Sequence, residues 1–263
     1  MLAWIERPKN GKDKQVVVFL HGFGGCAAQW DAMQKSIAPH CHTIAFDLPG
    51  HAGSLGHPDF GPPKVAAKAV IAELTNRGFS EWHLVGHSMG GAVSSLIALF
   101  APDHVKSLTL LAPGGFGPEI DDVSLAEWSK AKTAADFQAL LPRFFADGYS
   151  IPAEMIDMHV AQRQQDEAIE ALQSIADQVF ENGRQGRLPL DAVIGGAYPV
   201  TLIWGTQDTI IPVSQARSLQ DNADRGELEL IIVEGMGHMP AEEAPELVEK
   251  VILGNLKADG HCA

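Results

Sequence analysis

Short, almost entirely apolar runs recur along this chain, separated by longer segments in which apolar residues follow a helical spacing. Runs of about five aliphatic and β-branched residues are typical of strands buried on both faces of a sheet. Residues 65–76 and 91–101 have the length of helices that connect such strands. The alternation predicts an α/β fold, with a mostly parallel central sheet and helices on both faces. The predicted strands are residues 16–20, 42–47, 82–86, 107–111, 200–204 and 228–233.

The connection between the fourth and fifth predicted strands is unusually long and contains no convincing strand. It begins with the Pro- and Gly-rich segment 113–118 and ends with the flexible segment 181–187. Between them, residues 126–145 and 152–180 carry apolar side chains at helical spacing. An all-helical insertion with such borders predicts a cap over the carboxyl edge of the sheet, the alternative being peripheral helices. We expect a core of residues 1–113 and 189–263 and a helical cap of residues 114–188.

Composition narrows the class of protein and its partners. The 263 residues, 46% of them hydrophobic, suffice for one sizeable α/β domain. No stretch approaches the roughly 20 apolar residues of a membrane span, and residues 1–9 lack the features of a signal peptide. A net charge of −14 argues against nucleic acid and anionic membranes as partners. We expect a cytoplasmic protein that binds a small molecule; its oligomeric state stays open.

The cysteines and charged residues show no pattern of a metal or cofactor site. Cys26, Cys41 and Cys262 have neither paired nor metal-ligand spacing, which favours reduced thiols. No His, Cys, Asp or Glu cluster has metal spacing, and no Gly-rich loop carries the lysine of a phosphate-binding loop. The sequence therefore predicts no metal and no cofactor.

The first candidate for chemistry is Ser88, in the Gly-His-Ser-Met-Gly sequence of residues 86–90. The string follows a predicted strand and precedes a helix-like run. Such a tight turn from strand to helix strains the backbone of its central residue and exposes the side chain. It also needs glycines where the two backbones cross. We expect an exposed serine hydroxyl beside the positive end of a helix.

Two later residues complete a possible catalytic set. Asp208 comes just after the predicted strand 200–204, and His238 lies in a Gly-rich loop after the predicted strand 228–233. The carboxyl ends of parallel strands meet at one edge, where open α/β folds bind ligands. A nucleophilic serine needs a base to take its proton and a carboxylate to orient that base. The order serine, aspartate, histidine supplies all three.

Taken together, these motifs resemble those of the α/β-hydrolase superfamily over essentially the whole chain. The resemblance implies that Ser88 is the nucleophile, His238 the general base and acid, and Asp208 the orienting acid. It also implies an oxyanion hole formed by the backbone N–H groups of Phe23 and Met89. The matching segments are residues 21–25 (His-Gly-Phe-Gly-Gly), 47–51 (Asp-Leu-Pro-Gly-His), 86–90, 205–208 (Gly-Thr-Gln-Asp) and 237–238 (Gly-His).

Departures from the family pattern limit what the resemblance implies. A serine at position 88 excludes haloalkane dehalogenases and epoxide hydrolases, which use aspartate there. Carbon–carbon bond hydrolases typically follow the catalytic histidine with tryptophan, whereas Met239 follows His238 here. The family often has Gly-His-Gly-x-Ser in its second motif. In residues 50–54 (Gly-His-Ala-Gly-Ser) the second glycine stands one position later. The chain also resembles the hydrolase module of acetoin dehydrogenase acyltransferase subunits, but we infer no acyltransfer role without a lipoyl-carrying segment.

Other polar residues near the motifs are given structural roles. We expect His21 to hold the oxyanion loop, Asp47 to fasten a turn, and His51 and His57 to be exposed to solvent. Cys26 is interpreted as a small buried residue. Candidate substrate-binding residues are Gly22, Phe23, His87 and Met239. The tryptophans Trp30, Trp128 and Trp204 are interpreted as packing residues, and the cap residues Phe116, Trp128, Phe144, Phe145 and Met155 suggest an apolar pocket.

The predicted function is hydrolysis of a carboxylic ester of a small, apolar substrate through an acyl-enzyme intermediate. The same residues also suit carbon–carbon, thioester, amide or lactone hydrolysis. An alternative of another class is a ligand-binding receptor or scaffold that keeps the fold with little turnover. Turnover of a simple ester separates the two classes.

Overall fold

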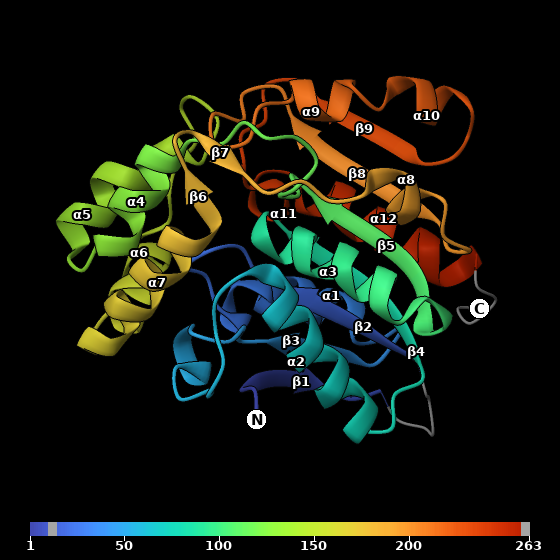
Figure 1. Ribbon diagram of the computed structural model, residues 1–263, viewed down its shortest axis with the longest axis horizontal. Helices are drawn as coiled ribbons and strands as arrows, with labels where there is room; N and C mark the ends of the chain where they lie inside the picture. Colours follow the sequence, from blue (N-terminus) through green and yellow to red (C-terminus); the bar gives the residue numbers. More distant parts are fainter. Residues whose placement is uncertain (10–14, 259–263) are drawn as a thin grey trace.

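The computed structural model describes residues 1–9 and 15–258, and within them the chain forms a seven-stranded sheet of order β1-β3-β2-β4-β5-β8-β9. All neighbours pair in parallel except β1, which pairs antiparallel with β3 at one edge (Figure 1). The α/β fold predicted from the sequence is confirmed. The strands of this sheet are β1 (Trp4–Arg7), β2 (Gln15–Leu20), β3 (Thr43–Phe46), β4 (Glu81–His87), β5 (Val105–Leu111), β8 (Val200–Gly205) and β9 (Glu229–Val233).

Helices cover both faces of the sheet because the inner strands are apolar on both sides. Alternate residues of β2 contribute to two separate cores: Val16 and Val18 face one, Val17 and Phe19 the other. Helices α2 (Pro63–Asn76), α3 (Met89–Phe100) and α8 (Leu190–Ile194) pack together on the first face, and α1 (Asp31–Ile37) with α12 (Pro245–Ala258) on the second. Shorter elements are η1 (Ala27–Trp30), η2 (Ala52–Ser54), η3 (Pro102–His104), α9 (Ser214–Arg217), α10 (Gln220–Asp224) and α11 (Pro240–Glu243).

The edge strand β1 was not among the predicted strands. It has only four residues, all half-buried, so it lacks the continuous apolar run by which the inner strands were recognised. Cys26 and Cys41 are buried free thiols, whereas Cys262 lies outside the described residues.

The long connection between β5 and β8 forms a helical group beside the sheet (Figure 1). The insertion forms several helices, as the sequence predicted, and each of the two stretches with helical spacing is divided between two α-helices. In the first stretch the division falls at Thr133, whose side chain and that of Asp136 cap each other's backbone N–H groups and start a new helix. The group consists of α4 (Asp122–Lys130), α5 (Ala134–Leu140), η4 (Leu141–Arg143), α6 (Ala153–Gln162) and α7 (Asp166–Val179), followed by the two-residue strands β6 (Phe180–Glu181) and β7 (Arg184–Gln185).

Candidate functional site

Ser88 occupies a strained turn between β4 and α3. Its φ of 52° and ψ of −116° lie outside the regions that ordinary residues prefer. The turn requires glycine on both sides. A Cβ at position 86 would lie 2.4 Å from the carbonyl oxygen of Gly90, and one at position 90 would lie 2.2 Å from the carbonyl oxygen of Leu20. The backbone therefore fixes Ser88 at the carboxyl end of β4, as the sequence predicted. The expectation of an exposed serine was wrong, because Ser88 is only 8% exposed.

His238 and Asp208 are joined by a buried hydrogen bond. The Nδ1–H of His238 donates to Oδ2 of Asp208 at 2.8 Å, and both side chains are almost completely buried. The other carboxylate oxygen, Oδ1, accepts from the backbone N–H groups of Ile210 at 2.9 Å and Ile211 at 2.8 Å. With Nδ1 carrying the proton toward Asp208, a neutral His238 has its lone pair on Nε2. This is the tautomer that a general base for a serine hydroxyl requires.

The loop that carries His238 is held by Glu243, a residue that the sequence reasoning missed. Its carboxylate accepts hydrogen bonds from the N–H of Gly237 at 3.0 Å and of Met239 at 3.1 Å, on either side of the histidine. It also accepts from the N–H of Ala146 in the helical insertion at 2.9 Å. The spacing from His238 to Glu243 corresponds to no recognised motif, so only the loop geometry reveals this contact.

The insertion touches both downstream loops through one short segment. The N–H of His238 donates to the carbonyl of Phe144 at 2.8 Å. Thr209, next to Asp208, donates its hydroxyl to the carbonyl of Arg143 at 2.7 Å. Together with Ala146, these contacts fasten the segment that follows η4 to the loops bearing His238 and Asp208.

The loop after β2 is held as the sequence predicted. The Nδ1–H of His21 donates to the carbonyl of Gly22 at 2.7 Å, and its Nε2 accepts from the N–H of Leu48 at 3.0 Å. Asp47 accepts from the N–H of Ala27 at 2.7 Å and that of Gly53 at 3.0 Å, which fastens two neighbouring loops. The structural roles expected of His21 and Asp47 are thus confirmed.

The N–H groups of Met89 and Phe23 are the predicted oxyanion donors; Met89 directly follows Ser88, and Phe23 lines the same pocket as Ser88. Met89 is the first residue of α3, and the first four N–H groups of a helix have no partner within it. Phe23 lies in the loop after β2, and that strand pairs directly with β4. Both side chains are 7% exposed, so the loop and the helix start are covered by protein.

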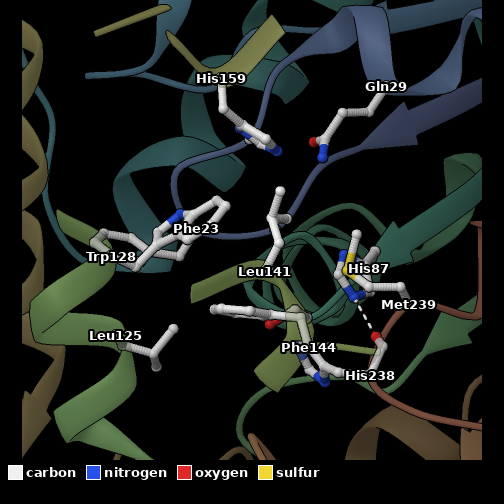
Figure 2. A pocket seen from close by; sticks show the side chains of 13 residues that line it. Phe23, Gln29, His87, Leu125, Trp128, Leu141, Phe144, His159, His238 and Met239 are labelled. Carbon is white, nitrogen blue, oxygen red and sulfur yellow. Dashed lines mark hydrogen bonds between the residues drawn. The ribbon is translucent and has the colours of Figure 1, made fainter. Parts of the chain in front are cut away.

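Ser88 and His238 line the same pocket, which lies between the sheet and the helical insertion (Figure 2). The predicted substrate-binding residues Gly22, Phe23, His87 and Met239 line it as well. The cavity volume is about 30 Å³. The insertion contributes Leu125, Trp128, Leu141, Phe144 and His159, and the remaining lining residues are Gly25 and Gln29.

His87 is buried and neutral beside His238. Its Nε2–H donates to the carbonyl of His238 at 2.8 Å, and the two ring centroids are 4.9 Å apart. Burial, together with the neighbouring His238, lowers the pKa of His87 to about 3. This histidine supports the loop through a hydrogen bond and is not available as a base toward Ser88.

Three other expectations have different outcomes. His57 is partly exposed, but His51 is only 3% exposed, so the prediction of solvent exposure was wrong for it. His51 is covered because the ring of Phe23 packs edge-on against it, and burial lowers its pKa well below the usual value. Cys26 is buried as predicted, and burial raises the pKa of its thiol to about 11.

Of the aromatic and apolar insertion residues suggested as pocket residues, Trp128 and Phe144 line the cavity beside Ser88. Phe145 instead stacks on Tyr149 with ring centroids 4.4 Å apart. Phe116 and Met155 belong to the hydrophobic core of the first face or pack against it. Helical spacing alone did not separate these two groups.

The described residues form neither a metal-binding cluster nor a membrane-spanning helix. Within residues 1–9 and 15–258, no group of three or more His, Cys, Asp or Glu side chains is arranged to bind a metal ion. None of the helices in this described part of the chain is both long and apolar enough to span a bilayer.

Comparison with known proteins identifies the family of this chain. The model of the Alpha/beta hydrolase family matches residues 17–251. The chain is 32% identical over 257 residues to the dihydrolipoyllysine-residue acetyltransferase component of the acetoin cleaving system of Pseudomonas putida, covering 98% of this chain and 67% of that protein. For the same component in Cupriavidus necator, the chain is 30% identical and spans 58% of its length.

More distant relatives cover similar shares of the chain. A monoacylglycerol lipase of Xenopus laevis, abhd6-B, is 28% identical over 272 residues, covering 95% of this chain and 77% of that protein. Among solved structures, the 2-hydroxy-6-oxo-6-phenylhexa-2,4-dienoate hydrolase of Rhodococcus sp. strain RHA1 superposes with a TM-score of 0.81 and 20% identity, covering 98% of this chain and all of that one. At that identity the likeness shows the fold. With the family model matching most of its length, this chain is a hydrolase of the Alpha/beta hydrolase family.

Proposed function

We propose that this protein is a serine hydrolase that cleaves a carboxylic ester of a small, largely apolar substrate through an acyl-enzyme intermediate. One observation carries the proposal. His238, oriented by its 2.8 Å hydrogen bond to Asp208, lines the same buried pocket as Ser88, which a strained turn presents there. A buried base of fixed tautomer that shares a pocket with a serine hydroxyl is the arrangement needed for nucleophilic catalysis.

In the proposed reaction, Ser88 Oγ attacks the ester carbonyl carbon while Nε2 of His238 takes the hydroxyl proton. The N–H groups of Met89 and Phe23 stabilise the tetrahedral oxyanion. Collapse of this intermediate breaks the bond to the alcohol, which leaves with the proton from His238. Water then attacks the acyl-enzyme, again giving its proton to His238, and the acid departs as Ser88 regains its proton. Asp208 stabilises the imidazolium that forms in each half of the cycle.

Two features favour an ester over the carbon–carbon alternative. Met239 follows His238, where carbon–carbon bond hydrolases of the family typically carry tryptophan. The Xenopus laevis relative is by its name a lipase of monoacylglycerol. The apolar lining that the insertion provides through Leu125, Leu141 and Phe144 suits the apolar part of an acyl chain next to the reacting carbonyl. The expected cytoplasmic location stays a prediction.

The test is a panel of 4-nitrophenyl esters of increasing acyl length, run with wild-type and Ser88→Ala protein. The proposal expects turnover of short esters by the wild type alone. A vinylogous diketone, a thioester, an amide and a lactone belong in the same panel. Preference for one of them by several orders of magnitude over every ester would reassign the bond. No turnover of any compound by a correctly folded wild-type protein would favour a receptor or scaffold.

A further inference from the structure

Polar atoms without partners gather on one wall of the pocket. Among the described residues, Trp128 Nε1, His159 Nδ1 and Arg163 Nε are buried and have no hydrogen-bond partner. Trp128 and His159 line the cavity, and Figure 2 shows them across it from His238. Buried polar groups in folded proteins are nearly always paired, so such a concentration at one cavity wall indicates a ligand or water that completes it.

Arg163, which does not line the cavity, adds a buried positive charge against the loop at Gly24. It is 3% exposed, and no carboxylate within residues 1–9 and 15–258 forms an ion pair with it. Its one side-chain hydrogen bond within these residues runs from Nη2 to the carbonyl of Gly24 at 3.1 Å. An unpaired buried charge is strongly destabilising, and this chain, at −14, has acidic residues in excess. The arrangement is explained if the missing negative charge comes from a ligand.

Gly24 brings the two strongest donors together. A Cβ at this position would lie 2.3 Å from Trp128 Nε1 and 2.8 Å from Arg163 Nη2, so both donors converge on the same point of the loop. The glycine lies between Phe23 and Gly25, which both line the cavity. Its φ of +70° and the absence of a side chain let Trp128 Nε1 and Arg163 Nη2 approach its backbone this closely.

A purely structural role accounts for only part of these contacts. Holding the carbonyl of Gly24 uses a single N–H of Arg163 and leaves Nε unpaired. Packing of Trp128 against the rings of Phe137 and Phe144 uses the faces and edges of the indole and not its N–H. An apolar residue would satisfy the packing at both positions without burying unpaired donors.

The charge states fit an anionic ligand. Burial lowers the pKa of Arg163 to about 10, which leaves the guanidinium charged at neutral pH. Burial and the nearby Arg163 lower the pKa of His159 to about 3. This imidazole is therefore neutral at neutral pH, and Arg163 supplies the positive charge. A guanidinium and an indole N–H are both donors, and together they suit the paired oxygens of a carboxylate.

We propose that this wall is a subsite for a carboxylate at the far end of the acyl group, with Trp128 and Arg163 as its donors and His159 beside them. The inference rests on the proposed function, because the acyl group is the part of the substrate that stays bonded to Ser88 in this cavity. The leaving group departs before water enters. The substrate class is therefore the monoester of a short dicarboxylic acid.

The test compares matched pairs of 4-nitrophenyl esters: hemiesters of malonic to adipic acid, and uncharged alkanoates of the same chain length. Rates are read against Ser88→Ala protein, which accounts for intramolecular breakdown of the hemiesters. We expect kcat/KM of the wild type to favour the best hemiester over its matched alkanoate by about tenfold or more. Trp128→Phe, which keeps a ring but removes the N–H, and Arg163→Met lower that ratio by about tenfold each. The matched control Arg217→Met, which removes an exposed cation, leaves the ratio unchanged.

A second readout separates this inference from the proposed function. Glutarate is expected to raise the melting temperature of the wild type more than butyrate does, and Trp128→Phe is expected to abolish the difference. If alkanoates are cleaved as well as hemiesters and neither variant changes the ratio, the wall holds only water and the subsite is refuted. If no ester is cleaved but glutarate still stabilises selectively, the proposed function fails and the carboxylate site stands.

Discussion

Glu243 holds the backbone on both sides of His238, and the same carboxylate binds the N–H of Ala146 in the helical insertion. The position of the candidate base is thus set by a residue outside the pocket lining, and that residue is linked to the insertion that supplies part of the lining. A displacement of the insertion at Ala146 would therefore move Glu243 and the loop that carries His238.

Replacing Glu243 with Gln is expected to lower kcat by about 10- to 100-fold with little change in KM, because catalytic geometry is sensitive to displacements of about 1 Å. The amide keeps one acceptor but turns a donor toward backbone N–H groups. Steady-state kinetics on the best ester measure the split. Glu246→Gln, an exposed neighbour on α12, is the control, and an equal loss in both variants would contradict the positioning role.

Asp208→Asn is expected to lower kcat by about 10⁴-fold, because an amide nitrogen facing Nδ1 favours the wrong tautomer of His238. The backbone N–H groups of Ile210 and Ile211 still find an acceptor in the remaining oxygen, so the loop is expected to fold. Circular dichroism checks the fold and single-turnover acylation measures the rate. Acylation within tenfold of wild type would remove Asp208 from the mechanism.

Leu141 limits the room beside Ser88, and Leu141→Ala is expected to shift preference toward longer acyl chains. It lies in the cavity lining at 1% exposure, and truncation of such a side chain leaves a cavity at a cost of about 2–5 kcal/mol in stability. The ratio of kcat/KM for hexanoate to that for acetate is expected to rise about tenfold. Leu140→Ala, buried but outside the cavity lining, serves as the matched control; the same rise there would show general loosening.

The buried His87 makes stability depend on pH. In the unfolded chain its pKa is about 6.5, and in the folded protein burial and His238 lower it to about 3. The unfolded chain therefore binds an extra proton between these values. The contribution of the neutral, buried His87 to the free energy of unfolding is fully present above about pH 6.5 and decreases as the pH falls toward 3. His87→Gln, which keeps a donor for the carbonyl of His238, is expected to reduce the loss of unfolding free energy between pH 7 and pH 5 by about 1–2 kcal/mol. Urea unfolding at both pH values measures it, and an unchanged loss would place the titration elsewhere.

The sequence predicted those parts of the site whose chemistry is local. The inner strands are apolar on both faces, so their runs are visible, and Ser88, Asp208 and His238 each follow such a run directly. The half-buried β1 was missed, and the positions of the breaks within the two stretches of helical spacing were not predicted. A four-residue edge strand has no distinctive pattern, and a helix break caused by reciprocal capping at Thr133 and Asp136 leaves the apolar spacing intact.

The sequence did not predict contacts between segments that are distant in the chain. The role of Glu243 depends on three backbone N–H groups that only the folded loops bring together. Arg163 and Gly24 are far apart in the chain, so their contact has no local signal. A loop position near the edge of the sheet predicts exposure of His51, yet Phe23 packs against it. The pocket wall depends on such packing, which explains why the substrate was the least predictable feature.

The central claim is that Ser88 is the nucleophile, and its most direct test is covalent labelling by a fluorophosphonate probe in wild-type and Ser88→Ala protein, with ester turnover in parallel. The account predicts labelling of the wild type at Ser88, identified by peptide mass spectrometry. In the folded alanine variant it predicts no labelling and a kcat lower by about 10⁶-fold. Full labelling or near-normal turnover of Ser88→Ala would contradict it.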